Sequence, residues 1–391
     1  MSSQRQNIAD DEKIPVIDVD CHPMPRHFDA NVKKHLPRRW QEYMTKYHPG
    51  VAFSSFGSPP QREFTHRLDA LDENGRVSVD PMFVKKQLLD EYDLTAAILT
   101  NISGFGITGA NRPAEMSRAL TAAFNDAIAE TWLQSDPRYY AAISVGRDIP
   151  HIVDEIRRCK EGPMGDRFVT VLIPPSGEAP LGKERYEPIL EACVHYDLPL
   201  SAHVPGTGAK GTALGHPSYY AEFHMNLAAH PMSTVPSLIF EGTFDRYPTL
   251  KIAFLELGWS WAPTVAWRLD KIHAKLRNEV SHLKRKPSEY MSDHFWFATQ
   301  PVEEPEQVRH TESIYQIFEE SGFADKLMYS SDYPHWDFDT PYDGVAAHHP
   351  IERRRRILGE NASKLFKIPL KQNSGILAKA GPGGVISPRA A

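Results

Sequence analysis

The sequence predicts an α/β fold, a (β/α)8 TIM-type barrel with loop insertions after its first and fifth strands. Three observations support this prediction. Eight short apolar runs alternate with longer stretches of helical spacing, which is typical of a parallel sheet covered by helices. No Gly-rich phosphate-binding fingerprint follows any of these runs, which disfavours the rival fold, an open doubly wound sheet. The 391 residues suffice for a barrel of ~250 residues that carries insertions.

Each element is expected where its periodicity is strongest. Near-continuous apolar runs predict buried strands at residues 16–20, 96–100, 140–145, 169–173, 200–203, 252–257, 295–299 and 327–331. Apolar residues at helical spacing predict helices within residues 116–134, 152–159, 186–196, 233–243 and 261–283.

We expect a single barrel domain over residues 14–370, between a flexible N-terminus (1–13) and a flexible C-terminal tail (371–391) rich in Gly, Pro and Ala. Two segments interrupt the alternation, at about 23–86 and 204–232. Both follow predicted strand ends, where barrel active sites are built. The alternatives are surface elaborations or part of a dimer interface.

The composition indicates which kinds of binding partner and which cellular compartment to expect. The net charge is −6 and the basic residues are scattered, so no nucleic-acid partner is expected. No apolar stretch approaches the ~18–20 residues of a membrane span, and the polar N-terminus lacks a signal-peptide core. Three cysteines are too few for a disulfide framework. We therefore expect a cytoplasmic protein that acts on a small-molecule substrate without a membrane partner.

The first predicted strand ends in hydrophilic residues at alternate positions, namely Asp18, Asp20 and His22. Because side chains alternate along a strand, all three are expected on one face. Burying them is costly unless something compensates them, and a divalent cation bound by carboxylate and imidazole does so. The alternative is a strand end that emerges into solvent.

Three further predicted strands end in metal-capable side chains. His203 ends the fifth, Glu256 the sixth, and Asp332 the eighth, with His335 close behind. Each alone has an ordinary explanation: a core histidine, an ion-paired rim carboxylate, or turn chemistry. In a barrel, however, these ends converge at one mouth. The predicted metal ligands are Asp18, Asp20, His22, His203, Glu256 and Asp332, and the predicted catalytic residues are Asp332, Glu256 and His335. Nitrogen and carboxylate ligands suit zinc, manganese or iron.

Substrate contacts are expected from the loops around the mouth. The aromatic candidates could line an apolar pocket, although they could equally pack the loops onto the barrel. Two arginines could grip a substrate carboxylate bidentately, unless they form surface salt bridges. The predicted substrate-binding residues are Arg26, Arg112, Phe105, Tyr219, Tyr220 and Phe223.

These motifs together resemble the amidohydrolase superfamily, in the amidohydrolase-related (amidohydrolase 2) branch similar to aminocarboxymuconate-semialdehyde decarboxylase. The matching pieces are residues 18–22, 202–203, 242–252, 330–335 and 359–362. The resemblance implies a metal-dependent barrel in which Asp20 and His22 form the first-strand ligand pair and His203 is the fifth-strand ligand. It implies that Asp332 binds metal and can shuttle a proton, and that the chain forms a homodimer.

One position departs from this family pattern. Decarboxylases of the branch usually carry an acid–base histidine after the sixth strand, where this sequence has Glu256. Glu256 could be a further ligand that, with Asp18 and His335, supports a second metal ion. It could instead be an acid–base group whose pKa is raised by a dry pocket.

The acid-rich ligand set leads us to expect a metal-dependent hydrolase that cleaves an amide, ester or thioester bond with metal-activated water. Asp332 or Glu256 would move the proton of that water. The alternative is non-oxidative decarboxylation of an aromatic or unsaturated carboxylic acid. A second alternative is a ligand-binding barrel without catalysis. One or two metal ions per chain are expected.

Overall fold

The structure, a computed structural model, describes residues 13–23, 30–47, 65–73, 75–102, 113–145, 149–175, 177, 179–204, 218–346, 348–371 and 373–378. Within these ranges no helix combines the length and the hydropathy needed to cross a bilayer.

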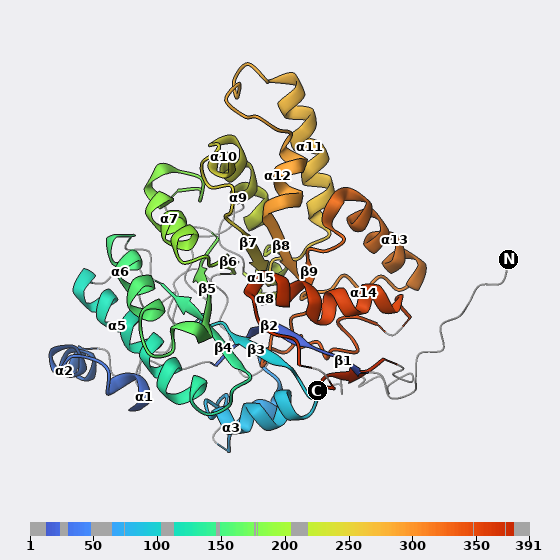
Figure 1. The fold of residues 1–391 in the computed structure, drawn as a ribbon. Coiled ribbons are helices and arrows are strands. Elements are labelled where there is room, and N and C mark those ends of the chain that lie inside the picture. Colours follow the sequence, from blue (N-terminus) through green and yellow to red (C-terminus); the bar gives the residue numbers. More distant parts are fainter. Residues whose placement is uncertain are drawn as a thin grey trace.

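Eight parallel strands form the central sheet, in which neighbours in the chain are neighbours in space (Figure 1). They are β2 (Ile17–Cys21), β3 (Ala96–Leu99), β4 (Tyr139–Ser144), β5 (Phe168–Ile173), β6 (Leu200–His203), β7 (Ile252–Leu255), β8 (Phe295–Ala298) and β9 (Leu327–Met328). The segment that follows β9 brings the sheet back to β2. The backbone N–H of Val19 donates to the Tyr329 carbonyl at 3.1 Å, and that of His22 donates to the Tyr333 carbonyl at 2.7 Å. The predicted barrel is confirmed.

Helices surround the strands because a parallel connection must cross from one end of the sheet to the other. The connections contain α3 (Pro81–Val84) with η3 (Lys85–Asp90), α5 (Ala114–Ala127) with η4 (Ile128–Leu133), α6 (Ile149–Lys160), α7 (Glu187–His195), α9 (Ala229–Phe240), α10 (Thr243–Arg246), α11 (Trp261–Lys275), α12 (Pro287–His294) and α13 (Val308–Phe318) with η7 (Glu319–Phe323). The last barrel strand is followed by α14 (Ile351–Arg355), η8 (Arg356–Glu360) and α15 (Asn361–Phe366). The predicted helices all occur, most with boundaries that differ by up to four residues, but the helix predicted over 261–283 ends at Lys275.

The strands separate two apolar layers. Ile17 and Val19 of β2 belong to an inner cluster with Ala253 and Leu255 of β7. Cys21 belongs to the outer cluster between strands and helices. Alternation along a strand sends successive side chains to these two layers. Polar side chains that face inward at one end of the strands can therefore lie close to one another at that end of the barrel.

The two insertions carry helices of their own. The first contains α1 (Ala30–Lys33) and α2 (Arg38–Tyr47), whose Trp40 and Met44 pack with Met116 and Phe124 of α5. Burial of these aromatic and sulfur-containing side chains fixes the inserted helices on the outside of the barrel. The second contains α8 (Tyr220–Met225), which has a capping box at its start.

Two short strands lie near the ends of the described chain. Strand β1 (Lys13–Ile14) pairs antiparallel with β10 (Ile376–Leu377), so that Lys13 and β10, from segments expected to be flexible, form a short two-stranded sheet with Ile14. Ile14 and Ile376 are both buried in the outer core cluster. Two paired residues give too weak a pattern to be predicted from the sequence, and this apolar contact holds them in place.

Gly375 allows this terminal sheet to form. Its φ is +111°, and a Cβ at this position would lie 1.8 Å from the carbonyl oxygen of Ile14. Gly375→Ala is therefore expected to lower the free energy of unfolding by about 2–3 kcal/mol, measured by urea denaturation. Gly75→Ala is the matched control, because Gly75 has a φ of +69° but no atom within 4 Å of the added Cβ. That control should cost about 1 kcal/mol, and equal losses in both variants would refute the steric argument.

Candidate metal centre

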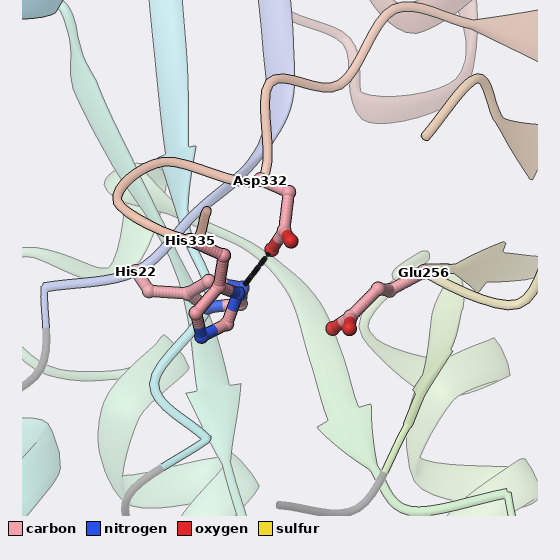
Figure 2. Close-up of side chains that lie close together, drawn as sticks. All are labelled: His22, Glu256, Asp332 and His335. Carbon is pink, nitrogen blue, oxygen red and sulfur yellow. Dashed lines mark hydrogen bonds and ion pairs between the residues drawn. The ribbon is translucent and has the colours of Figure 1, made fainter. Parts of the chain in front are cut away.

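Six of the predicted site residues meet at the carboxyl ends of the barrel strands. Asp20 and His22 come from the end of β2, His203 ends β6, and Glu256 follows β7 directly. Asp332 and His335 lie in the loop after β9, and Figure 2 shows them facing Glu256 across the mouth. All six are buried. Their ligand-type atoms form two groups, Asp20–His22–His203 and His22–Glu256–Asp332–His335, each within 4.8 Å.

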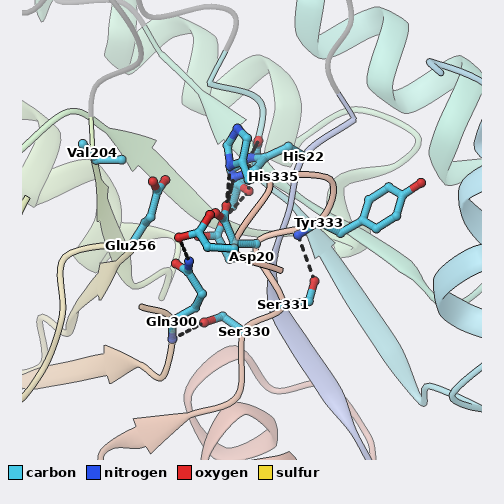
Figure 3. Close-up of polar contacts among 12 residues, drawn as sticks. Asp20, His22, Val204, Glu256, Gln300, Ser330, Ser331, Tyr333 and His335 are labelled. Carbon is cyan, nitrogen blue, oxygen red and sulfur yellow. Dashed lines mark hydrogen bonds and ion pairs between the residues drawn. The ribbon is translucent and has the colours of Figure 1, made fainter. Parts of the chain in front are cut away.

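The imidazole nitrogens and carboxylate oxygens of this centre lie close to one another. His203 Nε2 lies 3.1 Å from Asp20 Oδ2 and 3.3 Å from Glu256 Oε2. His22 Nε2 lies 2.7 Å from Asp332 Oδ1, which also accepts from His335 Nδ1 at 2.7 Å (Figures 2 and 3). Like-charged carboxylates gathered away from water need a positive charge between them.

Two histidines are oriented as metal ligands. His22 Nδ1 lies 2.8 Å from the Thr100 carbonyl oxygen, and His203 Nδ1 lies 2.8 Å from the Val204 carbonyl oxygen. A carbonyl only accepts, so each Nδ1 carries a proton, and each Nε2 is the ring nitrogen that faces the site. Metal-ligating histidines are characteristically fixed by such a second hydrogen bond.

Four buried atoms in this mouth have no hydrogen-bond partner among the residues that the structure describes: Asp20 Oδ2, His203 Nε2, Glu256 Oε2 and Asp332 Oδ2. Three of them are ion-pair neighbours, since His203 Nε2 lies 3.1 Å from Asp20 Oδ2 and 3.3 Å from Glu256 Oε2, but none of the four has a hydrogen bond. Buried polar atoms are almost always hydrogen-bonded, so four such atoms in one place require an explanation. A divalent metal ion satisfies carboxylate oxygens and an imidazole nitrogen at once. The residues present therefore fit a metal ion, and their nitrogen and oxygen donors match the sequence-based prediction of the ligand type.

Electrostatics separates the two carboxyl groups that face each other. Burial opposes ionisation of Asp332, but the charges and hydrogen bonds of His335 and His22 hold its pKa well below the usual range. For Glu256, burial and the negative charges of Asp332, Asp337 and Asp20 raise the pKa well above the usual range. These opposite shifts favour the ionised form of Asp332 and the protonated form of Glu256. Pairs of acids with opposite shifts are typical of acid–base sites.

The backbone is strained at the same two residues. Glu256 has a φ of +49° and Asp332 a φ of +55°, in the left-handed region that residues with a Cβ rarely adopt. Such a conformation costs about 1–2 kcal/mol. Strain of this kind gathers at functional sites, where the position of a side chain matters more than local stability.

Asp18 is not part of the group, which corrects the prediction that it is a metal ligand. Its Oδ1 accepts from the Ser331 N–H at 2.9 Å and the Asp20 N–H at 3.1 Å, and its Oδ2 accepts from the Ser331 hydroxyl at 2.6 Å. The pairing of β2 with β3 shifts register between Asp18 and Cys21. This bulge breaks the alternation, so that Val19 and Asp20 both face inward and Asp18 does not. Burial raises the pKa of Asp18 to about 7.

Asp18 is expected to support the fold rather than the metal. Asp18→Ala would leave the buried N–H and hydroxyl of Ser331 without their acceptor, at about 1–3 kcal/mol for each unsatisfied group. We expect the free energy of unfolding in urea to fall by about 3 kcal/mol while the metal content per chain stays at the wild-type value. Asp20→Ala is the matched control. It should lose metal, while its free energy of unfolding in urea changes less than that of Asp18→Ala. Loss of metal in Asp18→Ala would restore Asp18 as a ligand.

The predicted substrate-binding residues divide into three sets. Tyr220 lies near the centre, where burial and the charges of Glu256 and Asp337 raise its pKa. Tyr219 is exposed, so the structure does not bring it into the mouth. Phe223 packs against the outer core, and its ring centre lies 5.9 Å from that of Tyr220. Arg26, Phe105 and Arg112 lie outside the described residues.

Three polar residues at the mouth were missed by the sequence analysis. Asp337 Oδ2 accepts from Gln300 Nε2 at 2.5 Å and lies 2.9 Å from His224 Nε2. Gln300 follows β8, and its position after an apolar strand was an available signal (Figure 3). His224 lies in α8 and Asp337 in the loop after β9, and no local pattern links them.

Comparison with solved structures shows the same fold. An amidohydrolase from Mycobacterium avium subsp. paratuberculosis K-10 is 20% identical, with a TM-score of 0.67 over 90% of this chain and 99% of that one. A variant of 5-carboxyvanillate decarboxylase from Novosphingobium aromaticivorans, with manganese and 3-methoxy-4-hydroxy-5-nitrobenzoic acid bound, is 20% identical (TM-score 0.63; 90% and 97%). Dihydroxybenzoic acid decarboxylase from Polaromonas sp. JS666, with manganese and 2-nitroresorcinol, is 19% identical (0.60; 92% and 99%). No curated protein sequence gives a significant match.

These structures overturn one prediction. Hydrolysis of an acyl bond was expected from the acid-rich ligand set, and this expectation is wrong. Several of the similar structures are decarboxylases of aromatic acids, namely dihydroxybenzoates and 5-carboxyvanillate. They favour the alternative, non-oxidative decarboxylation. The prediction failed because the same ligand types can serve either reaction, so the ligand set alone does not determine which bond is cleaved.

The family assignment extends over nearly the whole barrel. The family model described as Amidohydrolase matches residues 17–368, from the first barrel strand to the end of the last helix. This range contains all six residues of the candidate metal centre. The chain therefore belongs to the amidohydrolase family and is an enzyme of that superfamily.

Proposed function

We propose that this protein is a manganese-dependent, non-oxidative decarboxylase of aromatic carboxylic acids. The observation that carries the proposal is that Glu256 and Asp332 meet in one buried group of metal-type ligands, with pKa values shifted in opposite directions. Decarboxylation of an aromatic acid requires one proton for the ring carbon, and this pairing provides it. The manganese bound in the similar decarboxylases supports the choice of metal.

Asp20, His22, His203 and Asp332 would hold the metal ion. When bound, it would supply positive charge that binds the substrate carboxylate and a neighbouring oxygen. The Thr100 and Val204 carbonyls keep both imidazoles in the ligating tautomer. The Thr100 hydroxyl also donates to Asp20 Oδ1, so that only Oδ2 is left to face the centre.

Glu256 would act as the general acid. Its Oε2 has no hydrogen-bond partner among the described residues, so the proton it carries is available to the substrate. Transfer of that proton to the ring carbon that bears the carboxylate lets the carbon–carbon bond break. The electron pair of that bond restores the aromatic ring, and carbon dioxide leaves. The charge of Asp332 raises the pKa of Glu256 and favours its reprotonation from water for the next turnover.

The test is a substrate panel on manganese-loaded protein. 2,6-Dihydroxybenzoate and 5-carboxyvanillate should release carbon dioxide. Each should give the ring product with hydrogen at the former carboxylate position, and chromatography measures that product. 4-Hydroxybenzoate, which lacks an oxygen beside the carboxylate, should react far more slowly. Stoichiometric metal without carbon dioxide release from any aromatic or unsaturated acid would refute the proposal.

A second role for Glu256 remains testable in the same protein. Glu256 Oε2 lies 3.3 Å from His203 Nε2, close enough for both to bind one ion. If Glu256 is a ligand and supports a second metal, two ions per chain are expected; if it is the acid, one is expected. We favour one, because burial and three neighbouring negative charges favour its protonated form. Homodimer formation and a cytoplasmic location stay predictions.

A further inference from the structure

A second polar cavity lies at the opposite end of the barrel from the metal centre. Its volume is about 610 Å³, within the usual range for small-ligand pockets. Lys251 directly precedes β7, Lys326 directly precedes β9, and Trp296 lies near the start of β8. Glu256 and Asp332 follow the other ends of β7 and β9. The cavity therefore opens at the amino ends of the strands that carry the metal centre.

The cavity has an excess of positive charge. Its cationic side chains are Lys251, Lys284, Arg285, Lys326 and Lys364, against the carboxylates Asp245 and Asp293. Both carboxylates are already engaged, since Arg285 Nη2 lies 2.6 Å from Asp293 and Tyr290 donates to Asp245 at 2.8 Å.

The lysines have little compensation. Lys326 and Lys364 share a single carboxylate, Asp325, at 3.4 and 3.0 Å. Within the described part of the chain, Lys251 donates only to a backbone carbonyl, that of Asp293, at 2.8 Å. Burial and the charges of Lys326 and Lys364 lower the pKa of Lys251. An anion would relieve this crowding of like charges.

Two buried donors point to the same conclusion. Trp296 is 3% exposed, and no described residue accepts from its Nε1–H. Lys326 is 9% exposed and its ammonium lies 4.5 Å from the centre of the Trp296 ring, with that of Lys364 at 5.9 Å. A buried indole N–H without an acceptor is unfavourable. An anion in the cavity would offer it an acceptor and offset the buried charge of Lys326.

We propose that this cavity binds a small polyanion, either a phosphate ester or a polycarboxylate. Its negative groups would accept hydrogen bonds from Lys251, Lys326 and Lys364 and from the Trp296 indole. Charge-assisted hydrogen bonds of this kind are about twice as strong as neutral ones, and a multiply charged ligand can engage several at once. The proposal concerns a different end of the barrel and does not depend on the proposed decarboxylase activity.

The test is isothermal titration of the full-length, metal-loaded protein with inorganic pyrophosphate and, separately, with tricarballylate. At least one is expected to bind saturably, and the tighter one identifies the phosphate or carboxylate class. The double variant Lys251→Gln/Lys364→Gln should bind at least about tenfold more weakly. Lys33→Gln/Lys86→Gln removes the same charge from two exposed lysines outside the cavity and should bind as the wild type does.

Lys284→Gln provides a second variant that cannot be confused with misfolding, because Lys284 is exposed at the cavity rim. It should weaken binding by about threefold. The absence of saturable binding by either probe at about 10 mM would overturn the proposal, since pockets with several charge-assisted contacts bind far below that concentration. Equal affinity in the wild type and in Lys251→Gln/Lys364→Gln would also overturn it, because the anion would then bind elsewhere, for example at the metal.

Discussion

Glu256→Gln is expected to lower kcat by about 10²–10⁴-fold, the usual contribution of a general acid. Glutamine matches the size of glutamate but has no proton to donate to the ring carbon. The metal content per chain should stay at the wild-type value if Glu256 is an acid, and KM should change little. The measurement is steady-state carbon dioxide release by manganese-loaded protein, with metal content determined on the same samples.

The wild-type pH profile gives a second readout of the same role. Because Glu256 must be protonated to act, kcat should fall as the pH rises through its raised pKa. Glu303→Gln is the matched control, since Glu303 also has a pKa raised by burial but is held by Ser260 outside the metal group. It should keep the wild-type kcat. A Glu256→Gln variant with full activity would remove the proposed acid, and one that lost its metal would make Glu256 a ligand.

His203→Ala is expected to remove both the metal and the activity. His203 Nε2 is buried without a hydrogen bond to any described residue, and it lies 3.1 Å from Asp20 Oδ2 and 3.3 Å from Glu256 Oε2. Substitution of a residue that only hydrogen-bonds to a metal ligand typically lowers metal affinity by about 10–100-fold. Loss of the ligand itself should therefore lower metal affinity by at least about 100-fold. Turnover should fall to background in limiting manganese. The measurement is metal content after gel filtration, with kcat/KM across a manganese titration.

His349→Ala is the control for loss of a buried histidine. His349 contacts Arg353 and Glu312, away from the metal group. It should retain metal and activity even if its melting temperature falls. Equal metal retention in His203→Ala and in the wild type would show that His203 is not a ligand.

Much of the fold follows from the sequence because its signals are periodic and local. The apolar runs that predict residues 200–203 and 252–257 as strands correspond to β6 and β7, and the parallel arrangement then places His203 and Glu256 at the same mouth. The terminal pair β1 and β10 was not predictable, because two residues carry no period and their pairing depends on a contact between the two ends of the domain.

The site was predictable in outline but not in detail. Alternation alone places Asp18 with Asp20 and His22, and only the bulge in β2 separates them. Bulges depend on how two strands fit, which the sequence of one strand does not reveal. The contact of Gln300 with Asp337 joins loops 37 positions apart. The reaction was mispredicted because a ligand set of histidines and carboxylates serves hydrolysis and decarboxylation alike.

The central claim is that acidic and imidazole groups from separate strands bind one shared metal ion. Anomalous diffraction at the manganese edge, on crystals of protein purified without chelators and loaded with manganese, tests it most directly. The account predicts one anomalous peak per chain, about 2.0–2.3 Å from a nitrogen of His203 and an oxygen of Asp20, with His22 and Asp332 completing the site. A peak elsewhere, or no peak in protein that folds normally, would contradict it.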